Sequence, residues 1–360
     1  MAIEFAQRIR RIPVYPVASG YDLGDDVAML ASNESCFAPL PEVTEAAARV
    51  LRGANRYPDP SYAPLRRALS DRYGVPRQRI ALGNGSCDIL LSAGEALLEP
   101  GAEVVYAWPA FSVYPHLAAS SGARAIEVPL DDQERHDLDA MAAEITVATR
   151  LVLICNPNNP TSTVLGLDAI EAFLEQVPRH VAVILDEAYC EFALTLGDPY
   201  ASVELLRRHP NLVLLRTFSK VYGLAALRVG YALCGSEDFR VAVDQVRQPF
   251  YLNAAAHAAA VEALRHQDEV ERRVARTLAS RIELEGGLRQ LGLWVADSEA
   301  NFVWTLLPDG VEDDEVVQAL LERGVLVRGG SALGRVGALR ITVGTEEENS
   351  RCLRAVAELL

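Results

Sequence analysis

The chain has 360 residues, of which 50% are hydrophobic and 23% charged, and its formal net charge is −15. At about 150 residues per domain this length predicts two domains, and the acidic balance argues against a nucleic-acid partner, because phosphate binding needs a basic face. The sequence has neither a signal-peptide pattern nor an apolar run of about 18 residues, so we expect neither a secreted nor a membrane-spanning protein.

Residues 1–28 show no clear periodicity and contain several prolines and glycines, which predicts an extended N-terminal arm. From residue 76 onward, short apolar strands alternate with helices. Strands are predicted at 79–82, 103–108, 123–130, 150–157, 180–189, 211–219 and 227–235, and helices at 87–98, 115–122, 138–145 and 167–177. This alternation predicts βαβ units and a mostly parallel sheet, in an α/β domain of residues 29–252.

The pattern changes near residue 253. A long helical stretch, residues 253–290, is expected to join the two domains. Three short strands follow, at 300–307, 324–330 and 339–344, and a helix closes the chain. They predict a second, smaller α+β domain of residues 253–360.

The cysteines are scattered along the chain, at positions 36, 87, 155, 190, 234 and 352. No two of them have C-x-x-C spacing, so we expect no zinc or other metal site and no disulfide framework. Several lie in apolar runs such as LVLIC and YALCG, which is typical of buried free thiols. Free thiols fit a reducing compartment, and we expect a cytoplasmic protein.

Polar residues follow several predicted strands, at the edge where open α/β sheets bind ligands. In GNGS, residues 83–86, the glycines permit close backbone approach and Ser86 can cap a helix, which favours an anion site. NPNNPT, residues 156–161, places Asn159 in a turn. Asp186 follows five apolar residues, so its carboxylate needs a partner if it is buried. Taken singly, these motifs also suit a plain connector, a proline-stiffened turn and an exposed strand end.

Lys220 is the only lysine in a chain whose Lys and Arg residues number 34. Arginine stays protonated, whereas a desolvated lysine can lose its proton and become a nucleophile. The count alone equally allows a leftover surface lysine. Thr217, Ser219 and Arg228 lie near Lys220 in the sequence, however, and they suit an anion beside a reactive amine. A phosphate site, a carboxylate and a Schiff-base lysine are what pyridoxal 5′-phosphate requires.

The motifs NES, RYPD, GNGS, WPAFSVY, NPNNPT, DEAY, TFSK, LRVGY and LRITVGT occur in this order over nearly the whole chain. In this order they resemble the fold-type I aminotransferases, and most of all the histidinol-phosphate aminotransferase branch. The resemblance implies a seven-stranded, mostly parallel sheet in a large domain that binds pyridoxal 5′-phosphate. It also implies a homodimer and a ping-pong reaction that passes an amino group from a small-molecule donor to 2-oxoglutarate.

The resemblance assigns cofactor roles to residues at matching positions. Lys220 would form the Schiff base and act as the general base, and Asp186 would pair with the pyridine nitrogen. Asn159 and Tyr189 would hydrogen-bond the O3′ oxygen, and Phe111 would stack on the ring. Around the phosphate the resemblance places Gly85, Ser86, Cys87, Thr217, Ser219 and Arg228, together with Tyr57 from the partner subunit.

Four further residues are assigned to the substrate by the resemblance. Arg340 and Arg328 would bind its anionic groups, and Tyr15 and Asn33 would line its site. The chain also departs from the family pattern. Ser162 replaces the usual Gly after NPT, Cys87 replaces an Asp or Asn, and NESCF stands where NENP is frequent. The last change affects the predicted substrate entrance.

Several functions stay open at this point. Two arginines suit the dianion of histidinol phosphate, whereas an aromatic amino acid needs one arginine and an apolar slot. A pyridoxal-dependent decarboxylase of a phosphorylated amino acid is a weaker alternative. A non-catalytic cofactor-sensing regulator would require a DNA-binding domain, which the net charge opposes. A nucleotide-dependent dehydrogenase is disfavoured, because Asp88 stands where G-x-G-x-x-G needs its third glycine.

Overall fold

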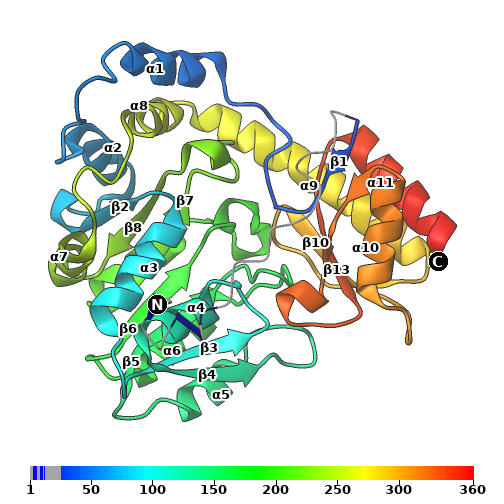
Figure 1. Cartoon of the computed structure of the whole chain (residues 1–360), viewed down its shortest axis with the longest axis horizontal. Coiled ribbons are helices and arrows are strands. Elements are labelled where there is room, and N and C mark those ends of the chain that lie inside the picture. The colour runs from blue at the N-terminus through cyan, green and yellow to red at the C-terminus, as the bar shows by residue number, and fades with distance from the viewer. Residues whose placement is uncertain (1–2, 6–8, 11, 13–25) are drawn as a thin grey trace.

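The computed structural model describes residues 3–5, 9–10, 12 and 26–360. Tyr15 and most of the predicted arm therefore lie outside the described residues. Two sheets of unequal size organise the rest, and the long helix α9 (Gln267–Gln290) runs between them (Figure 1). No helix in the described ranges is long and apolar enough to cross a lipid bilayer.

The large sheet has seven strands in the order β2-β8-β7-β6-β5-β3-β4. Only β8 runs antiparallel to its neighbours, and the other strand pairs are parallel. The predicted α/β class and the mostly parallel seven-stranded sheet are therefore confirmed. The strands are β2 (Ile80–Gly83), β3 (Glu103–Trp108), β4 (Arg124–Pro129), β5 (Thr149–Cys155), β6 (Ala182–Asp186), β7 (Leu212–Thr217) and β8 (Gly230–Cys234).

Helices cover both faces of this sheet, which explains why its central strands are apolar along most of their length. In β5, Val152 and Ile154 point to one core, whereas Leu151 and Leu153 point to the other, as the two-residue period of a strand requires. The first core includes side chains of α1 (Pro41–Leu51), α2 (Ala63–Tyr73), α5 (Leu138–Ala143), α6 (Leu167–Gln176) and α8 (Ala254–Ala263). The second includes those of α3 (Ser86–Leu97), α4 (Tyr114–Ser121) and α7 (Glu237–Val246).

The small sheet is antiparallel, with the strand order β12-β13-β10-β9. Its core packs against α9, α10 and α11, and α11 begins with a capping box between Thr345 and Glu348. β1, which straddles the predicted boundary at residue 28, pairs with β11 of the C-terminal region. The predicted domain bounds stay a prediction. The elements here are β1 (Ala28–Met29), β9 (Trp294–Val295), β10 (Phe302–Leu306), α10 (Asp313–Glu322), β11 (Val325–Leu326), β12 (Arg328–Gly329), β13 (Ala338–Thr342) and α11 (Glu346–Leu359).

The helical stretch predicted at residues 253–290 is two helices, α8 and α9, separated at residues 264–266. No proline or glycine marks this break in the sequence. It follows from packing, because α8 lies against α1 and α2, whereas α9 diverges toward the small sheet (Figure 1).

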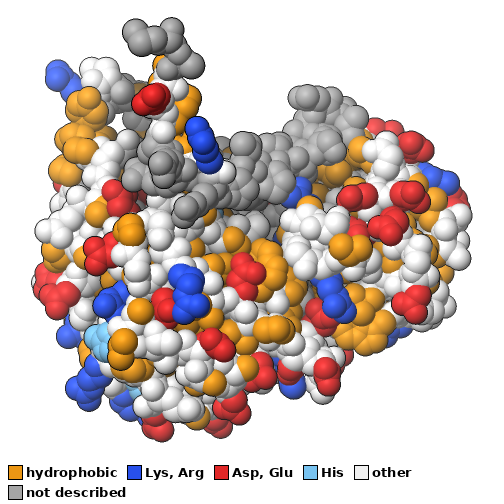
Figure 2. Space-filling view, turned by 60° about the horizontal axis from the view of Figure 1, so that its bottom comes forward, with side chains coloured by type: hydrophobic (Ala, Val, Ile, Leu, Met, Phe, Trp, Pro, Cys, Tyr) orange, Lys and Arg blue, Asp and Glu red, His pale blue; other side chains and the backbone are white. Residues whose placement is uncertain are grey.

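Charged side chains are mixed over the face seen in Figure 2, where acidic and basic groups of the described residues alternate. Among the described residues, several exposed arginines pair with acids along a single helix, such as Arg272 with Asp268 at 3.0 Å. Exposed pairs of this kind contribute little to stability. On the face that Figure 2 shows, the basic groups of the described residues do not form one broad basic surface.

Candidate functional site

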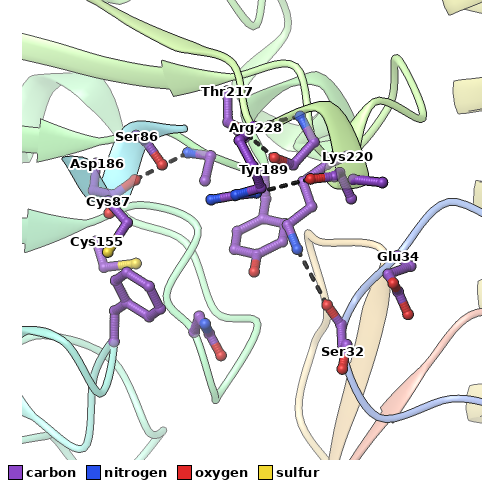
Figure 3. A pocket seen from close by; sticks show the side chains of 16 residues that line it. Ser32, Glu34, Ser86, Cys87, Cys155, Asp186, Tyr189, Thr217, Lys220 and Arg228 are labelled. Atoms are coloured by element: carbon purple, nitrogen blue, oxygen red, sulfur yellow. Dashed lines mark hydrogen bonds between the residues drawn. The ribbon is translucent and has the colours of Figure 1, made fainter. Parts of the chain in front are cut away.

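A cavity of about 380 Å³ lies at the edge of the large sheet where β5, β6 and β7 end and β8 begins (Figure 3). Because β8 runs antiparallel, the segment before it reaches the same edge as the segments after the parallel strands. The cavity thus brings together residues from six separate stretches of the chain. Of the predicted site residues, it is lined by Ser86, Cys87, Phe111, Asn159, Asp186, Tyr189, Thr217, Ser219, Lys220 and Arg228.

One end of the cavity is built to hold an anion. Ser86 begins α3, so the unpaired N–H groups and the dipole of this helix face the cavity. Gly85 precedes it with φ +78°, and a Cβ there would lie 2.3 Å from Nη2 of Arg228. On the other side, Thr217 Oγ1 donates to Ser219 Oγ at 2.9 Å. Hydroxyls, helix N–H groups and a guanidinium therefore converge on one small space.

Asp186 lies at the deep end of the cavity, at the last position of β6, and is 3% exposed. Tyr114 OH donates to its Oδ2 at 3.2 Å, and the Ala188 N–H donates to Oδ1 at 3.3 Å. Burial raises the pKa of Asp186 to about 7, despite these hydrogen bonds. A buried carboxylate whose pKa is raised to this extent is stabilised in its charged form by a ligand that presents a protonated nitrogen.

Lys220 points into the same cavity. Its Nζ donates to the Ser32 carbonyl oxygen at 3.2 Å and lies 5.5 Å from the centre of the Tyr189 ring. Burial lowers the pKa of Lys220 to about 7, and the positive charges of Arg340 and Arg228 act in the same direction. A substantial fraction of the amine is therefore neutral at neutral pH, and a neutral amine is a nucleophile and a base.

We expect the lowered pKa of Lys220 to be visible in chemical labelling. Because only the deprotonated amine reacts, the rate of reductive methylation of the cofactor-free protein should rise with pH and level off above about pH 7. Mass spectrometry can follow the Lys220 peptide without interference from other lysines. Protein unfolded in denaturant is the control, with a midpoint near the free-lysine value of about 10.4. A native rate that keeps rising toward pH 10 would contradict the expectation.

Residues of the small sheet reach the cavity through hydrogen bonds. Arg340, on β13, donates from Nη1 to Asn159 Oδ1 at 2.6 Å and from Nη2 to the Ala31 carbonyl oxygen. Asn33 donates from Nδ2 to Tyr189 OH at 3.1 Å and accepts from Thr342 Oγ1 on β13. The predicted substrate residues Asn33 and Arg340 are therefore linked to the predicted cofactor residues, although neither lines the cavity itself.

Two other predicted residues lie apart from the cavity. Arg328 on β12 pairs with Arg340 across the antiparallel strands, so their side chains share one face of the small sheet. Tyr57 is 80% exposed, and its ring stacks on that of Phe250 at 4.5 Å. Tyr57 does not line the cavity of its own chain.

The cavity also contains residues that the sequence reasoning did not assign. Ser32, Glu34 and Cys155 line it, and Tyr114 supports Asp186 from behind. Cys155 ends an apolar strand, a position that by sequence alone is typical of a buried core thiol. Tyr114 was missed although it is the last residue of the WPAFSVY motif, three positions after Phe111 at the start of α4.

Two of the three departures from the family pattern, Ser162 and Cys87, have visible structural effects. Ser162 is fully buried with φ +62°, a conformation that favours glycine. Its hydroxyl donates to the Thr161 carbonyl oxygen at 2.5 Å. Burial raises the pKa of the Cys87 thiol to about 11. Cys87 therefore stays a neutral thiol, which is a weaker donor than an amide.

The residues present fit a phosphate-bearing pyridine aldehyde. The Arg228 guanidinium, which lies against Gly85, and the start of α3 suit the phosphate. Asp186 suits a protonated ring nitrogen, and the desolvated Lys220 amine suits an aldehyde carbon.

Comparisons with known proteins agree with this chemistry. The family model for aminotransferase class I and II matches residues 25–356. An aromatic amino acid aminotransferase of Thermobifida fusca is 45% identical over 91% of this chain and 88% of its own length. Histidinol-phosphate aminotransferase 2 of Ralstonia nicotianae is 43% identical over 97% of this chain and 93% of its own length. The solved structure of a histidinol-phosphate aminotransferase from Sinorhizobium meliloti, in complex with pyridoxal 5′-phosphate, has a TM-score of 0.86 at 28% identity. That match covers 100% of this chain and 98% of the other.

Proposed function

This chain belongs to the class I and II aminotransferase family, whose cofactor is pyridoxal 5′-phosphate, and we propose that it transfers the amino group of L-histidinol phosphate to 2-oxoglutarate. The family membership rests on the match of the family model over residues 25–356. The choice of substrate rests on the pair of arginines that share one face of the small sheet.

The cofactor is held, in this proposal, by the residues that line the cavity. Ser86, Thr217, Ser219 and Arg228 bind the phosphate, and Asp186 holds the ring nitrogen in its protonated state. Bound in this way, pyridoxal 5′-phosphate supplies an electron sink for the negative charge that develops at the substrate Cα. Asn159 and Tyr189 orient the ring through its oxygen, and Phe111 excludes water from one of its faces.

We expect Gly85→Ala to weaken cofactor binding about tenfold or more, because the new Cβ would displace the Arg228 guanidinium that lies 2.3 Å from it. The backbone strain at φ +78° adds about 1 kcal/mol of instability. Gly74→Ala is the matched control, since Gly74 has φ +66° and nothing within 4 Å of the added Cβ. Absorbance titration with pyridoxal 5′-phosphate measures the affinity. Equal affinity losses in both variants would remove Gly85 from the phosphate site.

Lys220 carries the proton transfer in this proposal. With a pKa of about 7, a substantial fraction of its amine is neutral near pH 7, so it can accept the proton from the substrate Cα as the general base. Arg340 and Arg228 keep the pKa of Lys220 low, and its contact with Ser32 holds the amine within the cavity. The reaction therefore uses one side chain both to anchor the cofactor and to move the proton.

The phosphate substrate is supported by the register of β12 and β13. Arg328 and Arg340 stand directly opposite each other on β12 and β13, so two guanidinium groups share one face of the small sheet. A phosphate dianion neutralises the charge of two guanidinium groups better than a single carboxylate does. The 43% identity to a histidinol-phosphate aminotransferase points the same way.

An aromatic amino acid is the second candidate for the donor. The relative from Thermobifida fusca, at 45% identity, carries that name. Steady-state kcat/KM for L-histidinol phosphate and for L-phenylalanine, both with 2-oxoglutarate, separates the two. We expect the phosphate substrate to be favoured by about tenfold or more, and by less in Arg328→Gln. A higher kcat/KM for phenylalanine would overturn the choice of substrate and leave the family unchanged.

We further propose a homodimer in which Tyr57 completes the cofactor site of the partner subunit. The support is that Tyr57 is exposed and held by stacking on Phe250, and lines no cavity in its own chain. Mixed dimers of Tyr57→Phe and Lys220→Ala subunits test this. One intact site should form in each mixed dimer, so activity should exceed that of either parent. No recovery of activity on mixing would contradict the proposal.

A further inference from the structure

A second cavity, of about 510 Å³, lies outside the site described above. One wall is α9, which contributes Val270, Val274 and Leu278 at successive turns. The opposite wall is the segment after β6, with Leu194 and Tyr200. Its volume is in the range of about 300–1,000 Å³ that small-molecule sites occupy, and its walls suit a small apolar group.

A buried carboxylate faces this cavity. Glu191 lines it, belongs to the short 3-10 helix Cys190–Phe192, and is 5% exposed. Among the residues that the structure describes, none forms an ion pair with it. Arg216, a nearby cation, is engaged with Glu187 at 2.8 Å and with Ser202 at 3.1 Å. Burial raises the pKa of Glu191 to about 7, and the charges of Arg216 and Arg72 offset this effect only in part.

A cation lines the same cavity without meeting Glu191. The Arg72 guanidinium lies beside the rings of Tyr73 and Tyr200, 5.3 Å and 4.8 Å from their centres. Its Nε is buried and has no hydrogen-bond partner in the described part of the chain. Arg72 acts electrostatically on Glu191, yet the two form no ion pair. A cation and an anion that are separated in this way match the two ends of a zwitterion.

We propose that this cavity is a second ligand site, which binds an α-amino acid with an apolar side chain. Glu191 accepts hydrogen bonds from the ammonium group, Arg72 donates to the carboxylate, and the side chain packs against Val270, Val274 and Leu278. The assignment depends on these contacts and is independent of which amino donor the enzyme uses.

The second site adjoins the first through neighbouring residues of the chain. Glu191 lies two residues after Tyr189, which lines the first cavity. Glu187 and Arg216 form an ion pair near Glu191. Glu187 directly follows Asp186, and Arg216 directly precedes Thr217. A ligand on Glu191 therefore acts on the ends of β6 and β7, which position the Asp186 carboxylate and the Thr217 hydroxyl.

Calorimetric titration of holoenzyme with α-methyl-L-phenylalanine tests the proposal. This probe has no α-proton, and prior reduction with borohydride prevents its amine from displacing Lys220. We expect saturable binding with one site per subunit. Glu191→Gln should weaken binding about tenfold or more, because a charge-assisted bond becomes a neutral one. Glu271→Gln, an exposed residue at the rim of the same cavity, is the matched control and should change affinity less than about twofold.

Two further measurements identify the chemical class of the ligand and provide a second variant in case the first does not fold. Phenethylamine and 3-phenylpropanoate, which each lack one charge of the zwitterion, should bind about tenfold more weakly or worse. If Glu191→Gln does not fold, Ala275→Trp, an exposed change on α9 that fills the cavity, should abolish binding. Absence of binding, or binding that survives both Glu191→Gln and Ala275→Trp, would overturn the proposal.

Discussion

Lys220→Arg is expected to lower kcat by at least about 10⁴-fold, although the substitution keeps the positive charge. A substantial fraction of the native amine is neutral near pH 7, because burial and two neighbouring arginines lower its pKa to about 7. A guanidinium does not lose its proton at any pH that a protein tolerates, so it can neither bond an aldehyde nor accept the Cα proton. Both functions of the side chain therefore disappear together.

Stopped-flow kinetics of the amino-donor half-reaction measures the loss directly. Mass spectrometry of borohydride-reduced protein adds a second readout, since the wild type should carry its cofactor adduct on the peptide that contains Lys220, and Lys220→Arg should carry none. Lys220→Ala with added ethylamine is the control, because a free amine in the vacated space should restore part of the proton transfer. Turnover near the wild-type rate in Lys220→Arg would refute the role of this residue.

Asp186→Ala is expected to lower kcat by about 10²- to 10³-fold, the usual cost of removing a group that stabilises charge in a transition state. The carboxylate is buried and held by Tyr114 and the Ala188 N–H, so no water easily replaces it. Without it, the ring nitrogen of the cofactor loses its proton more readily, and the electron sink weakens. The effect should fall on kcat more than on KM, because the carboxylate does not touch the substrate.

Tyr114→Phe is the graded control for this experiment. It keeps the carboxylate and removes a single hydrogen bond of 3.2 Å, so we expect a loss of about tenfold or less. Absorbance spectra over a pH series report the protonation of the bound ring in each variant. If Asp186→Ala kept more than about a tenth of the wild-type kcat, the ring nitrogen would have to be stabilised elsewhere.

The large sheet could be predicted because most of its strands are short apolar runs followed by a polar turn. β3 and β5 begin and end within one or two residues of the expected positions. The missed helices lacked such a signal. α2, for example, buries only Leu65 and Leu69, which is too few positions to establish a helical period. The break between α8 and α9 arises from the different surfaces that they contact, which no local pattern records.

The site could be anticipated where it depends on strand ends, and less where it depends on contacts between distant segments. Lys220 and Asp186 follow from the chemistry of their residue types at the edge of the sheet. The link from Arg340 to Asn159 joins positions 181 residues apart, and Tyr114 meets Asp186 from across the sheet core. No sequence motif singles out Glu191, and only the three-dimensional structure reveals a cavity beside it.

The hydrogen bond from Arg340 to Asn159 also determines the polarity of the cavity wall at Asn159. A guanidinium can only donate, so it fixes the amide rotamer with Oδ1 toward the small sheet. The Nδ2 end is then left to serve as a donor elsewhere. A strand far along the chain thereby dictates whether this wall offers hydrogens or lone pairs to an occupant. An incoming anion that draws Arg340 away would free the Asn159 amide to rotate. Binding of an anion at the small sheet would thereby change whether Asn159, at the large sheet, offers a donor or an acceptor.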